Sequence, residues 1–303
     1  MVAAARAAGM RVLFKPHLEM GHPPLSPEQR RLLRGPDAPQ RRALLARLQA
    51  ERAAQGWHGD IAMKSEAVRL LKTLEHPCGY FADRVAQNLG IDPLAADQPQ
   101  IYALALPRGY RRAGGHIYRP ACPRCRACTP SRIPVAEFRP DRSQRRCLAR
   151  NEDLTLGVEP AAATDEAYAL YQRYLAERHP GGGMDDADPE DFDRFLVSPW
   201  SPTRFLCLRE RGRLLAVAVT DVMREGLSSV YTFYDPGEAA RGLGTYAILS
   251  QVALARREGL PHVYLGYWIE GHAKMGYKAR YRPLEVLRGQ RWERQAPAPG
   301  KPG

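Results

Sequence analysis

The chain has 303 residues, of which 44% are hydrophobic and 26% charged, a composition typical of a folded protein with room for two domains. No stretch approaches the ~18 apolar residues of a membrane helix, and no secretion signal is visible, so we expect a cytoplasmic protein without a membrane partner. The net charge of +12 indicates an anionic partner. A general bias of composition toward arginine explains the same number, so the positions of the basic residues must decide.

Residues 1–62 differ from the rest of the chain. Prolines punctuate residues 23–39, and Arg, Ala, Leu and Gln dominate residues 41–55, which predicts a linker and at most one helix. Met63 begins a segment that looks like a natural start. We interpret residues 1–62 as a disordered extension or a mis-assigned start, and residues 293–303 as a disordered tail. The folded part is expected to divide into residues 63–150 and 151–292.

Between residues 67 and 150, short apolar runs alternate with turn signals, which predicts small strands around a cysteine site. Three cysteines recur at two-residue spacing in residues 122–128, where a tight turn can direct several thiolates at one centre. Cys78 lies in a Pro/Gly turn, whereas Cys147 and Cys207 fall in an expected helix and an expected strand. Zinc or an iron–sulfur cluster would suit four thiolates equally well, and free thiols are the alternative. The expected metal ligands are Cys78, Cys122, Cys125 and Cys128, with no organic cofactor.

A basic helix is expected next, opened by Pro140. Its arginines follow a spacing of three and four, which places most of them on one face. Guanidinium groups this close repel one another unless an anion screens them, so an RNA backbone is the expected partner, with a solvated surface helix as the alternative. The residues concerned are Arg139, Arg142, Arg145, Arg146 and Arg150.

The second half predicts an α/β core of the acyltransferase type. A helix over residues 164–178 has its apolar positions at spacings of three and four. Residues 204–209, 214–223 and 228–234 are expected to form an antiparallel meander. A helix over residues 244–257 ends at a Gly/Pro stop, and a strand over residues 262–268 follows.

A glycine loop joins the last meander strand to that helix. Gly242 and Gly244, followed by Thr245, bring free backbone N–H groups to a helix start, where an anion is favoured. Taken alone, this pattern is equally compatible with a simple turn. The strand at 262–268 is rich in aromatic residues and leads into a segment that interleaves Lys, Arg and Tyr, which suits either stacking on unpaired bases or an ordinary core strand.

Seven blocks of this sequence, in order, resemble the arginyl-tRNA-protein transferase family, and more closely its bacterial branch, the aspartate/glutamate leucyltransferases. The blocks are Cys78–Tyr80, Arg119–Cys128, Phe138–Arg146, Tyr231–Pro236, Leu243–Tyr246, Tyr264–Ile269 and Lys274–Ala279. The resemblance runs from about Val68 to Trp292 and implies an α+β fold, with a GNAT-like acyltransferase domain and a smaller N-terminal cysteine-containing domain. One departure concerns the metal, because eukaryotic arginyltransferases have two cysteines around the Gly-Tyr pair where this chain has only Cys78.

The resemblance also implies the reaction, in which leucine moves from Leu-tRNA to the N-terminal Asp or Glu of an acceptor protein. An oxyanion donor and a base are needed for this aminoacyl transfer. The candidates are Tyr231, Thr232, Tyr234, Asp235 and Tyr267, among which no single base can be chosen. An acidic acceptor calls for cations, for which the candidates are Lys274, Lys278 and Arg280.

Three alternatives stay open at this point: arginine as the donor amino acid, an acetyltransferase that uses coenzyme A, and a non-catalytic RNA-binding protein. The cysteine domain and the basic helix argue against the second alternative, and the α/β half argues against the third. The sequence does not determine the oligomeric state.

Overall fold

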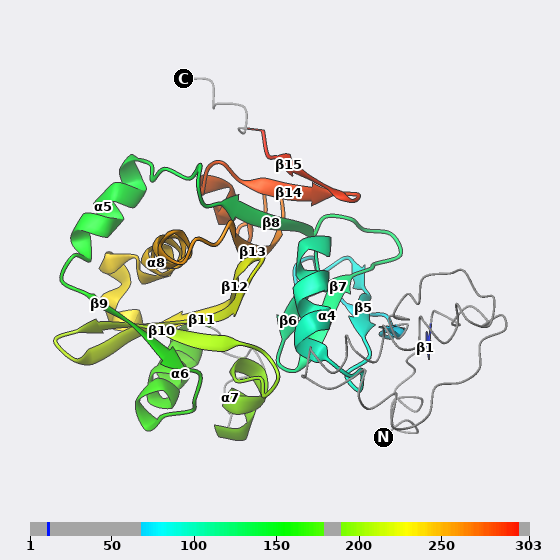
Figure 1. Ribbon diagram of the computed structural model, residues 1–303, viewed down its shortest axis with the longest axis horizontal. Helices are drawn as coiled ribbons and strands as arrows, with labels where there is room; N and C mark the ends of the chain where they lie inside the picture. Colours follow the sequence, from blue (N-terminus) through cyan, green and yellow to red (C-terminus); the bar gives the residue numbers. More distant parts are fainter. Residues whose placement is uncertain (1–10, 13–67, 179–188, 297–303) are drawn as a thin grey trace, which may run out of the picture. The chain divides into compact units, whose positions relative to one another are not determined.

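The structure is a computed structural model that describes residues 11–12, 68–178 and 189–296 (Figure 1). The extension expected at residues 1–62 lies outside the described residues, apart from the short strand β1 (Arg11–Val12). The last strand continues to Arg294, so the disordered tail expected at residues 293–303 does not include its first two residues, and residues 297–303 lie outside the described residues. In the described part of the chain, no helix is long and apolar enough to cross a membrane.

A small antiparallel sheet carries the N-terminal part of the fold. Its strands follow the order β2-β5-β7-β6, and a separate two-stranded hairpin, β3-β4, lies between β2 and β5 in the chain. Its helical elements are α4 (Gln98–Ala105) and the 3-10 turn η1 (Leu106–Arg108). The strands are β2 (Leu70–Lys72), β3 (His76–Pro77), β4 (Val85–Ala86), β5 (Asn88–Ile91), β6 (Arg111–Ala113) and β7 (His116–Pro120).

A larger, mixed sheet forms the centre of the fold. Among the described residues it has eight strands in the order β15-β14-β8-β13-β12-β11-β10-β9. The predicted meander is confirmed as β10, β11 and β12, and the strand predicted at 262–268 is confirmed as β13. The strands are β8 (Thr129–Pro134), β9 (Thr155–Pro160), β10 (Thr203–Glu210), β11 (Arg213–Met223), β12 (Gly226–Tyr234), β13 (His262–Trp268), β14 (Glu285–Arg288) and β15 (Arg291–Arg294).

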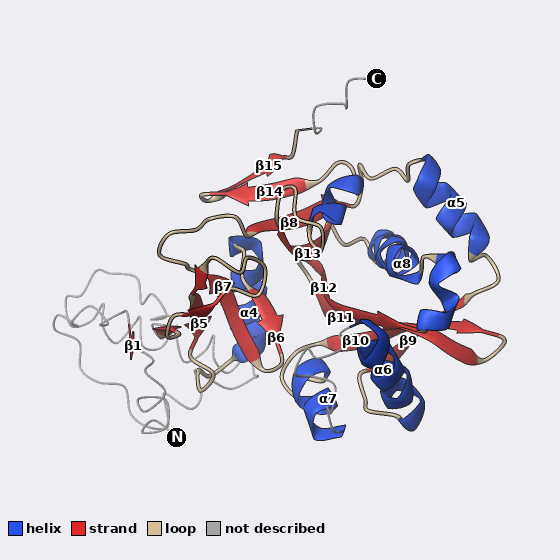
Figure 2. Cartoon of the chain, turned by 180° about the vertical axis from the view of Figure 1, so that it is seen from behind, coloured by secondary structure: helices blue, strands red, loops and turns tan. Residues whose placement is uncertain are grey.

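Helices cover both faces of this sheet (Figures 1 and 2). On one face, α8 (Leu243–Arg257) packs on the strands through Ala247, Ile248 and Val252, and α5 (Arg142–Arg150) lies outside it. On the other face, α6 (Asp165–Arg178) and α7 (Pro189–Leu196) enclose a second core that contains Phe192 and Phe233. Two further 3-10 turns are η2 (Pro236–Arg241) and η3 (Gly276–Arg280). The predicted α+β class is therefore confirmed, as is the order of meander, glycine loop, helix and strand.

Local sequence explains where two of the helices begin. Asp141 caps α5, because its carboxylate accepts from the Gln144 backbone N–H at 2.8 Å while the Gln144 side chain accepts from the Asp141 N–H. The helix therefore starts at Arg142 rather than at Pro140, and the prediction that Arg139 is a helical residue is wrong. The Thr164 hydroxyl accepts from the Ala167 N–H at 3.2 Å, which confirms the cap expected for α6.

The two sheets share a core and a buried ion pair. A third hydrophobic cluster includes Tyr102 and Ile117 of the small sheet and its helix, together with Tyr264 of β13. Beside it, the guanidinium of Arg112 binds the carboxylate of Asp221 on β11 through two hydrogen bonds of 2.9 and 2.8 Å, and both side chains are fully buried. β8 and α5, which precede the boundary expected at residue 150, pack with the larger sheet.

Strands β12 and β13 run parallel and then separate. Their pairing consists of Leu227 with Val263 and Ser228 with Tyr264. Beyond these residues, β12 continues beside β11, and β13 continues beside β8 after an irregularity at Gly266, whose φ is +69°. A positive φ favours glycine, so the sequence allows the kink at this position. We call the space between the diverging strands, from Val230 to Gly266, the strand gap.

Candidate functional site

Arg111 of β6 lies in the strand gap. Its guanidinium Nη2 donates to the carbonyl of Val230 on β12 at 3.3 Å, and its Nε donates to the Arg112 carbonyl at 3.4 Å. On the other side, a Cβ added to Gly266 would stand 3.5 Å from Arg111 Nη1. That distance is an ordinary van der Waals contact, so the guanidinium lies directly beside Gly266, between the two strands where their pairing ends.

A second cation, Lys278 of η3, lies close to Arg111. Only 4% of Lys278 is exposed, and its Nζ donates to the backbone carbonyl of Tyr267 at the end of β13. Burial, followed by the nearby positive charge of Arg111, lowers the pKa of the Lys278 ammonium to about 7. In the part of the chain that the structure describes, neither Arg111 nor Lys278 forms an ion pair with a carboxylate.

Tyrosine side chains surround these two cations. Burial raises the pKa of the Tyr80 and Tyr277 hydroxyls, while the nearby charge of Arg111 opposes the shift in both. Tyr118 of β7 interacts electrostatically with Tyr80 and Tyr267, and its ring centroid lies 6.4 Å from that of Tyr267. The site is therefore aromatic and basic. Protonated phenols here can donate hydrogen bonds to an anion. We call the residues Tyr80, Arg111, Tyr118, Tyr277 and Lys278 the cation–tyrosine site.

The enclosed space beside the strand gap is small. Its cavity of about 10 Å³ has walls that include Arg111, Ser228 and Tyr264, and it has room for about one water molecule. An amino-acid side chain does not fit inside it. A ligand of the cation–tyrosine site must therefore approach from the open side, where Arg111 is partly exposed.

The predicted catalytic residue Tyr267 has a structural contact. Its buried hydroxyl lies 3.1 Å from the Gly109 carbonyl and 3.2 Å from the Tyr118 carbonyl, to which it donates. Burial first, and then the neighbouring Tyr118, raise the pKa of this phenol well above its ordinary value. The hydroxyl of Tyr267 thus holds the small sheet against β13 instead of facing the open side.

The last four residues of strand β12 include the predicted catalytic residues Tyr231, Thr232 and Tyr234. The Tyr231 ring packs edge-on against Tyr174 of α6 with centroids 6.3 Å apart, and burial raises the pKa of its hydroxyl. The Tyr234 hydroxyl accepts a 2.7 Å hydrogen bond from Arg178 Nη2, and Tyr234 and Tyr277 influence each other electrostatically. The candidates on β12 therefore border the cation–tyrosine site through Tyr234, whereas Tyr231 faces α6.

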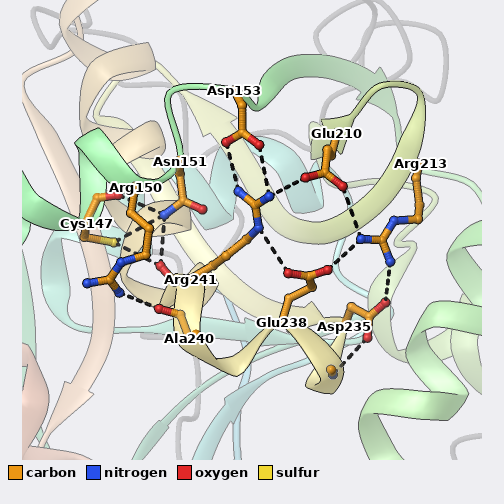
Figure 3. A network of polar contacts seen from close by, with 11 residues as sticks. Cys147, Arg150, Asn151, Asp153, Glu210, Arg213, Asp235, Glu238, Ala240 and Arg241 are labelled. Carbon is orange, nitrogen blue, oxygen red and sulfur yellow. Dashed lines mark hydrogen bonds and ion pairs between the residues drawn. The ribbon is translucent and has the colours of Figure 1, made fainter.

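Asp235 is held by the loop that follows β12 (Figure 3). Its Oδ1 accepts from the Gly237 N–H at 3.0 Å, and its Oδ2 lies 3.6 Å from Arg213 Nη1. Asp235 is therefore the N-cap of η2 and a partner of an arginine. Both carboxylate oxygens have partners, so this arrangement does not present Asp235 as a free base.

Arg241 precedes the glycine loop and is surrounded by carboxylates (Figure 3). It binds both oxygens of Asp153 at 2.9 Å, donates to Glu238 at 3.1 Å and also contacts Glu210. Three acids thus surround one guanidinium, which leaves the local charge negative. A phosphate next to Arg241 would be disfavoured, and this argues against a coenzyme pyrophosphate at this end of the loop.

The C-terminus of α5 supports the same loop. Asn151 Nδ2 donates to the Arg241 carbonyl at 2.9 Å, the Cys147 thiol lies 3.6 Å from the Gly242 carbonyl, and Arg150 donates to the Ala240 carbonyl. Gly242 has a φ of +68° as the cap of α8. The expected binding of tRNA by Gly242, Gly244 and Thr245 stays a prediction. Gly244 lies near the Tyr234 ring, and Thr245 interacts with the Tyr281 hydroxyl.

The predicted arginines give α5 an exposed basic face. Arg142, Arg145, Arg146 and Arg150 are exposed, and within the described residues none of them, nor Arg139, forms an ion pair. The Arg145 side chain donates to the Pro140 carbonyl at 2.7 Å. A cationic surface without counter-ions is suited to a phosphate backbone.

The four predicted metal ligands share one neighbourhood but do not form a coordination site. Burial raises the pKa of the Cys128 thiol to about 11, with further contributions from Cys122, Cys78 and Cys125. Cys122 donates to the Gln87 carbonyl at 3.8 Å, and Cys125 accepts from Arg84 at 3.4 Å. Among the described residues, no group of three or more His, Cys, Asp or Glu side chains is arranged to hold a metal ion. The metal centre therefore stays a prediction.

The predicted acceptor-binding cations do not lie together. Lys278 is in the cation–tyrosine site, whereas Lys274 and Arg280 are exposed. The Arg280 carbonyl accepts from Gln144 of α5 at 3.1 Å, which places Arg280 beside the basic helix. Sequence reasoning missed Arg111, because one of two adjacent arginines in a three-residue strand has no distinctive pattern.

Comparisons with known proteins identify the family of this chain. Residues 76–146 match the family described as "Arginine-tRNA-protein transferase, N terminus", and residues 166–288 match its C terminus. An aspartate/glutamate leucyltransferase of Stenotrophomonas maltophilia (strain R551-3) is 58% identical over 241 residues, which cover 78% of this chain and 95% of that protein. A protein of the same name from Xylella fastidiosa (strain 9a5c) is 52% identical over 231 residues, or 74% of this chain and 91% of the relative.

Among solved structures, the C-terminal domain of a putative lysylphosphatidylglycerol synthetase from Agrobacterium fabrum is similar at 16% identity and a TM-score of 0.40, over 54% of this chain and 60% of that one. A likeness at this level does not bear on function. The two family matches and the identity to the leucyltransferases define an enzyme that transfers an aminoacyl group from tRNA to a protein. The chain belongs to the arginine-tRNA-protein transferase family.

Proposed function

We propose that this enzyme transfers leucine from Leu-tRNA to the N-terminal Asp or Glu of acceptor proteins. The observation that carries the proposal is the 58% identity to an aspartate/glutamate leucyltransferase over 95% of that relative. The cation–tyrosine site is consistent with an acidic acceptor, because it is aromatic and basic and its two cations form no ion pair with a carboxylate of the described residues.

The proposed chemistry places modest demands on the protein. The ester of the donor is already activated, and the acceptor α-amine, with an ordinary pKa near ~7.7 to 8, is partly neutral in a cell. Holding the two groups together supplies much of the rate. Of the predicted catalytic residues, Tyr234 best combines a polar group with the border of the site, and Arg178 keeps its hydroxyl proton pointing away from the guanidinium.

The proposed tRNA surface is the arginine face of α5. Gln144 ties α5 to η3, so Arg280 extends this face toward the cation–tyrosine site. A tRNA acceptor stem bound along α5 would approach the glycine loop, whose geometry α5 maintains through Asn151. The charge of α5 and the position of the site are therefore compatible with one bound tRNA.

The direct test of this function is mass spectrometry of peptides that begin with Asp, Glu, Asn or Lys, after incubation with Leu-tRNA or Arg-tRNA. The expected result is the mass gain of one leucine on the Asp and Glu peptides alone. A gain of arginine would instead assign the enzyme an arginine donor. Transfer of leucine to the Lys peptide would contradict the proposed acceptor.

Charge reversal on α5 tests the tRNA surface. We expect R142E/R146E to weaken Leu-tRNA binding and to reduce the dependence of the affinity on salt by about two phosphate contacts. The matched control R194E/R204E reverses two exposed arginines that lie on α7 and β10, outside α5. Equal losses in both variants would mean that only the net charge of the protein matters.

A further inference from the structure

The cation–tyrosine site contains two positive charges that the described part of the protein does not neutralise. Arg111 bonds to two backbone carbonyls, through Nε and Nη2, and Lys278 bonds to one. Carbonyl oxygens are weaker partners for a cation than a carboxylate is. Buried charges in proteins are normally paired, because an unpaired charge away from water is costly.

The arrangement is that of an anion receptor. Arg111 Nη1 faces Gly266, where no side chain intervenes, and Lys278 Nζ keeps two N–H donors beyond the one that it gives to the Tyr267 carbonyl. The hydroxyls of Tyr80 and Tyr277 lie in the same electrostatic neighbourhood. A guanidinium, an ammonium and phenol donors together match the two oxygens of a single carboxylate.

The location favours a carboxylate over a nucleic-acid phosphate. The arginines of α5 are exposed, whereas Arg111 is partly buried among aromatic rings at the point where β12 and β13 separate. A side-chain carboxylate on a short stem reaches such a position more easily than a bulky backbone phosphate. The arginine face of α5 already provides a surface for the phosphates.

We propose that Arg111 and Lys278 bind the side-chain carboxylate of the acceptor's first residue and thereby set its specificity. This inference rests on the proposed function, which it deepens by naming the two residues. It retains Lys278 from the sequence prediction, adds Arg111 and assigns no carboxylate contact to Lys274 or Arg280.

The experiment compares the enzyme with R111Q and K278M, using peptides that differ only in a first residue of Asp or Asn. We expect each variant to lower the ratio of kcat/KM for Asp over Asn by about tenfold to a hundredfold, mainly by lowering the value for Asp. The matched control R108Q changes an exposed arginine of η1 and should leave the ratio unchanged.

R111K is the control for a folding defect, because it keeps the positive charge but loses the planar guanidinium that can donate two parallel hydrogen bonds. We expect it to have circular dichroism like that of the parent and an intermediate ratio. If R111Q and R111K lower the Asp and Asn values by the same factor, or change neither, the inference is wrong. A weaker affinity for Leu-tRNA with a smaller salt dependence, at an unchanged Asp/Asn ratio, would assign Arg111 to a tRNA phosphate and would also overturn it.

Binding of a fluorescent Asp peptide without tRNA separates this inference from the proposed function. We expect the parent to bind the Asp peptide more tightly than the Asn peptide, and R111Q to bind the two alike. If this holds while the parent transfers no leucine, the proposed donor is wrong and the carboxylate site stands. If the parent transfers leucine to Asp but R111Q still prefers the Asp peptide, the function stands and the site is wrong.

Discussion

The buried pair of Arg112 and Asp221 allows a quantitative test of how the small sheet is attached to the larger one. Arg112 makes two hydrogen bonds to Asp221, one to the Gly114 carbonyl at 3.0 Å and one to the Thr203 hydroxyl at 3.1 Å. Thr203 in turn donates to Asp221 at 2.7 Å. Neither charged side chain has any exposed surface. Removal of one partner therefore leaves the other charge buried and unpaired.

We expect R112M to lower the free energy of unfolding by about 3 to 5 kcal/mol, the usual cost of breaking a buried ion pair from one side. For a folded region of this size, that loss corresponds to a fall in Tm of roughly 10 °C or more. This loss is a large fraction of the free energy of unfolding of a typical folded protein, which is about 5 to 15 kcal/mol. Urea unfolding followed by tryptophan fluorescence, together with thermal scans, measures the loss.

The double variant R112M/D221L separates the cost of leaving one buried charge unpaired from the cost of changing the surrounding packing. Removal of both charges should cost less than the sum of the two single changes, because no charge is left unpaired. R257M, which removes an exposed arginine whose partner Glu258 is also exposed, is the control and should cost less than about 1 kcal/mol. The reasoning is refuted if R112M costs as little as R257M, or if the double variant loses the full sum.

The remaining predictions concern pH and metal content. The Lys278 side chain faces Arg111, Cys128, the Tyr277 ring and the Tyr267 carbonyl. Because its pKa is lowered to about 7, the charged ammonium predominates below pH 7 and is lost above it. Binding of an Asp peptide should therefore weaken between about pH 6 and 8, roughly one unit on either side of that pKa. The same titration of K278M should lack this component, and an identical pH profile in both proteins would contradict the assignment. Elemental analysis of anaerobically purified protein should find zinc or iron held by the cysteine thiolates. The metal centre is contradicted if both metals are absent and an alkylating reagent modifies the thiols of Cys78, Cys122, Cys125 and Cys128.

Local patterns were sufficient for α6, α8 and the meander. The apolar spacing in residues 164–178 and 244–257 predicted α6 and α8, because a helix that buries one face must repeat its apolar residues every three or four positions. The β-rich run over residues 262–268 coincides with β13. The exposed arginine face of α5 also followed from spacing, since residues four apart share a face. In each case the determining residues are neighbours in the chain.

Tertiary structure alone decided which polar groups meet. Arg241 stands next to the glycine loop in the sequence, and only folding brings Asp153, 88 residues away, and Glu210, 31 residues away, to its guanidinium. Arg111 had no local signal, and its place between β12 and β13 depends on the point at which two strands from distant segments part. Local periodicity determines which face of a helix or strand is buried. The partner of a charged side chain is instead decided by the packing of segments that are far apart in the sequence, and no local sequence pattern indicates which segments will meet.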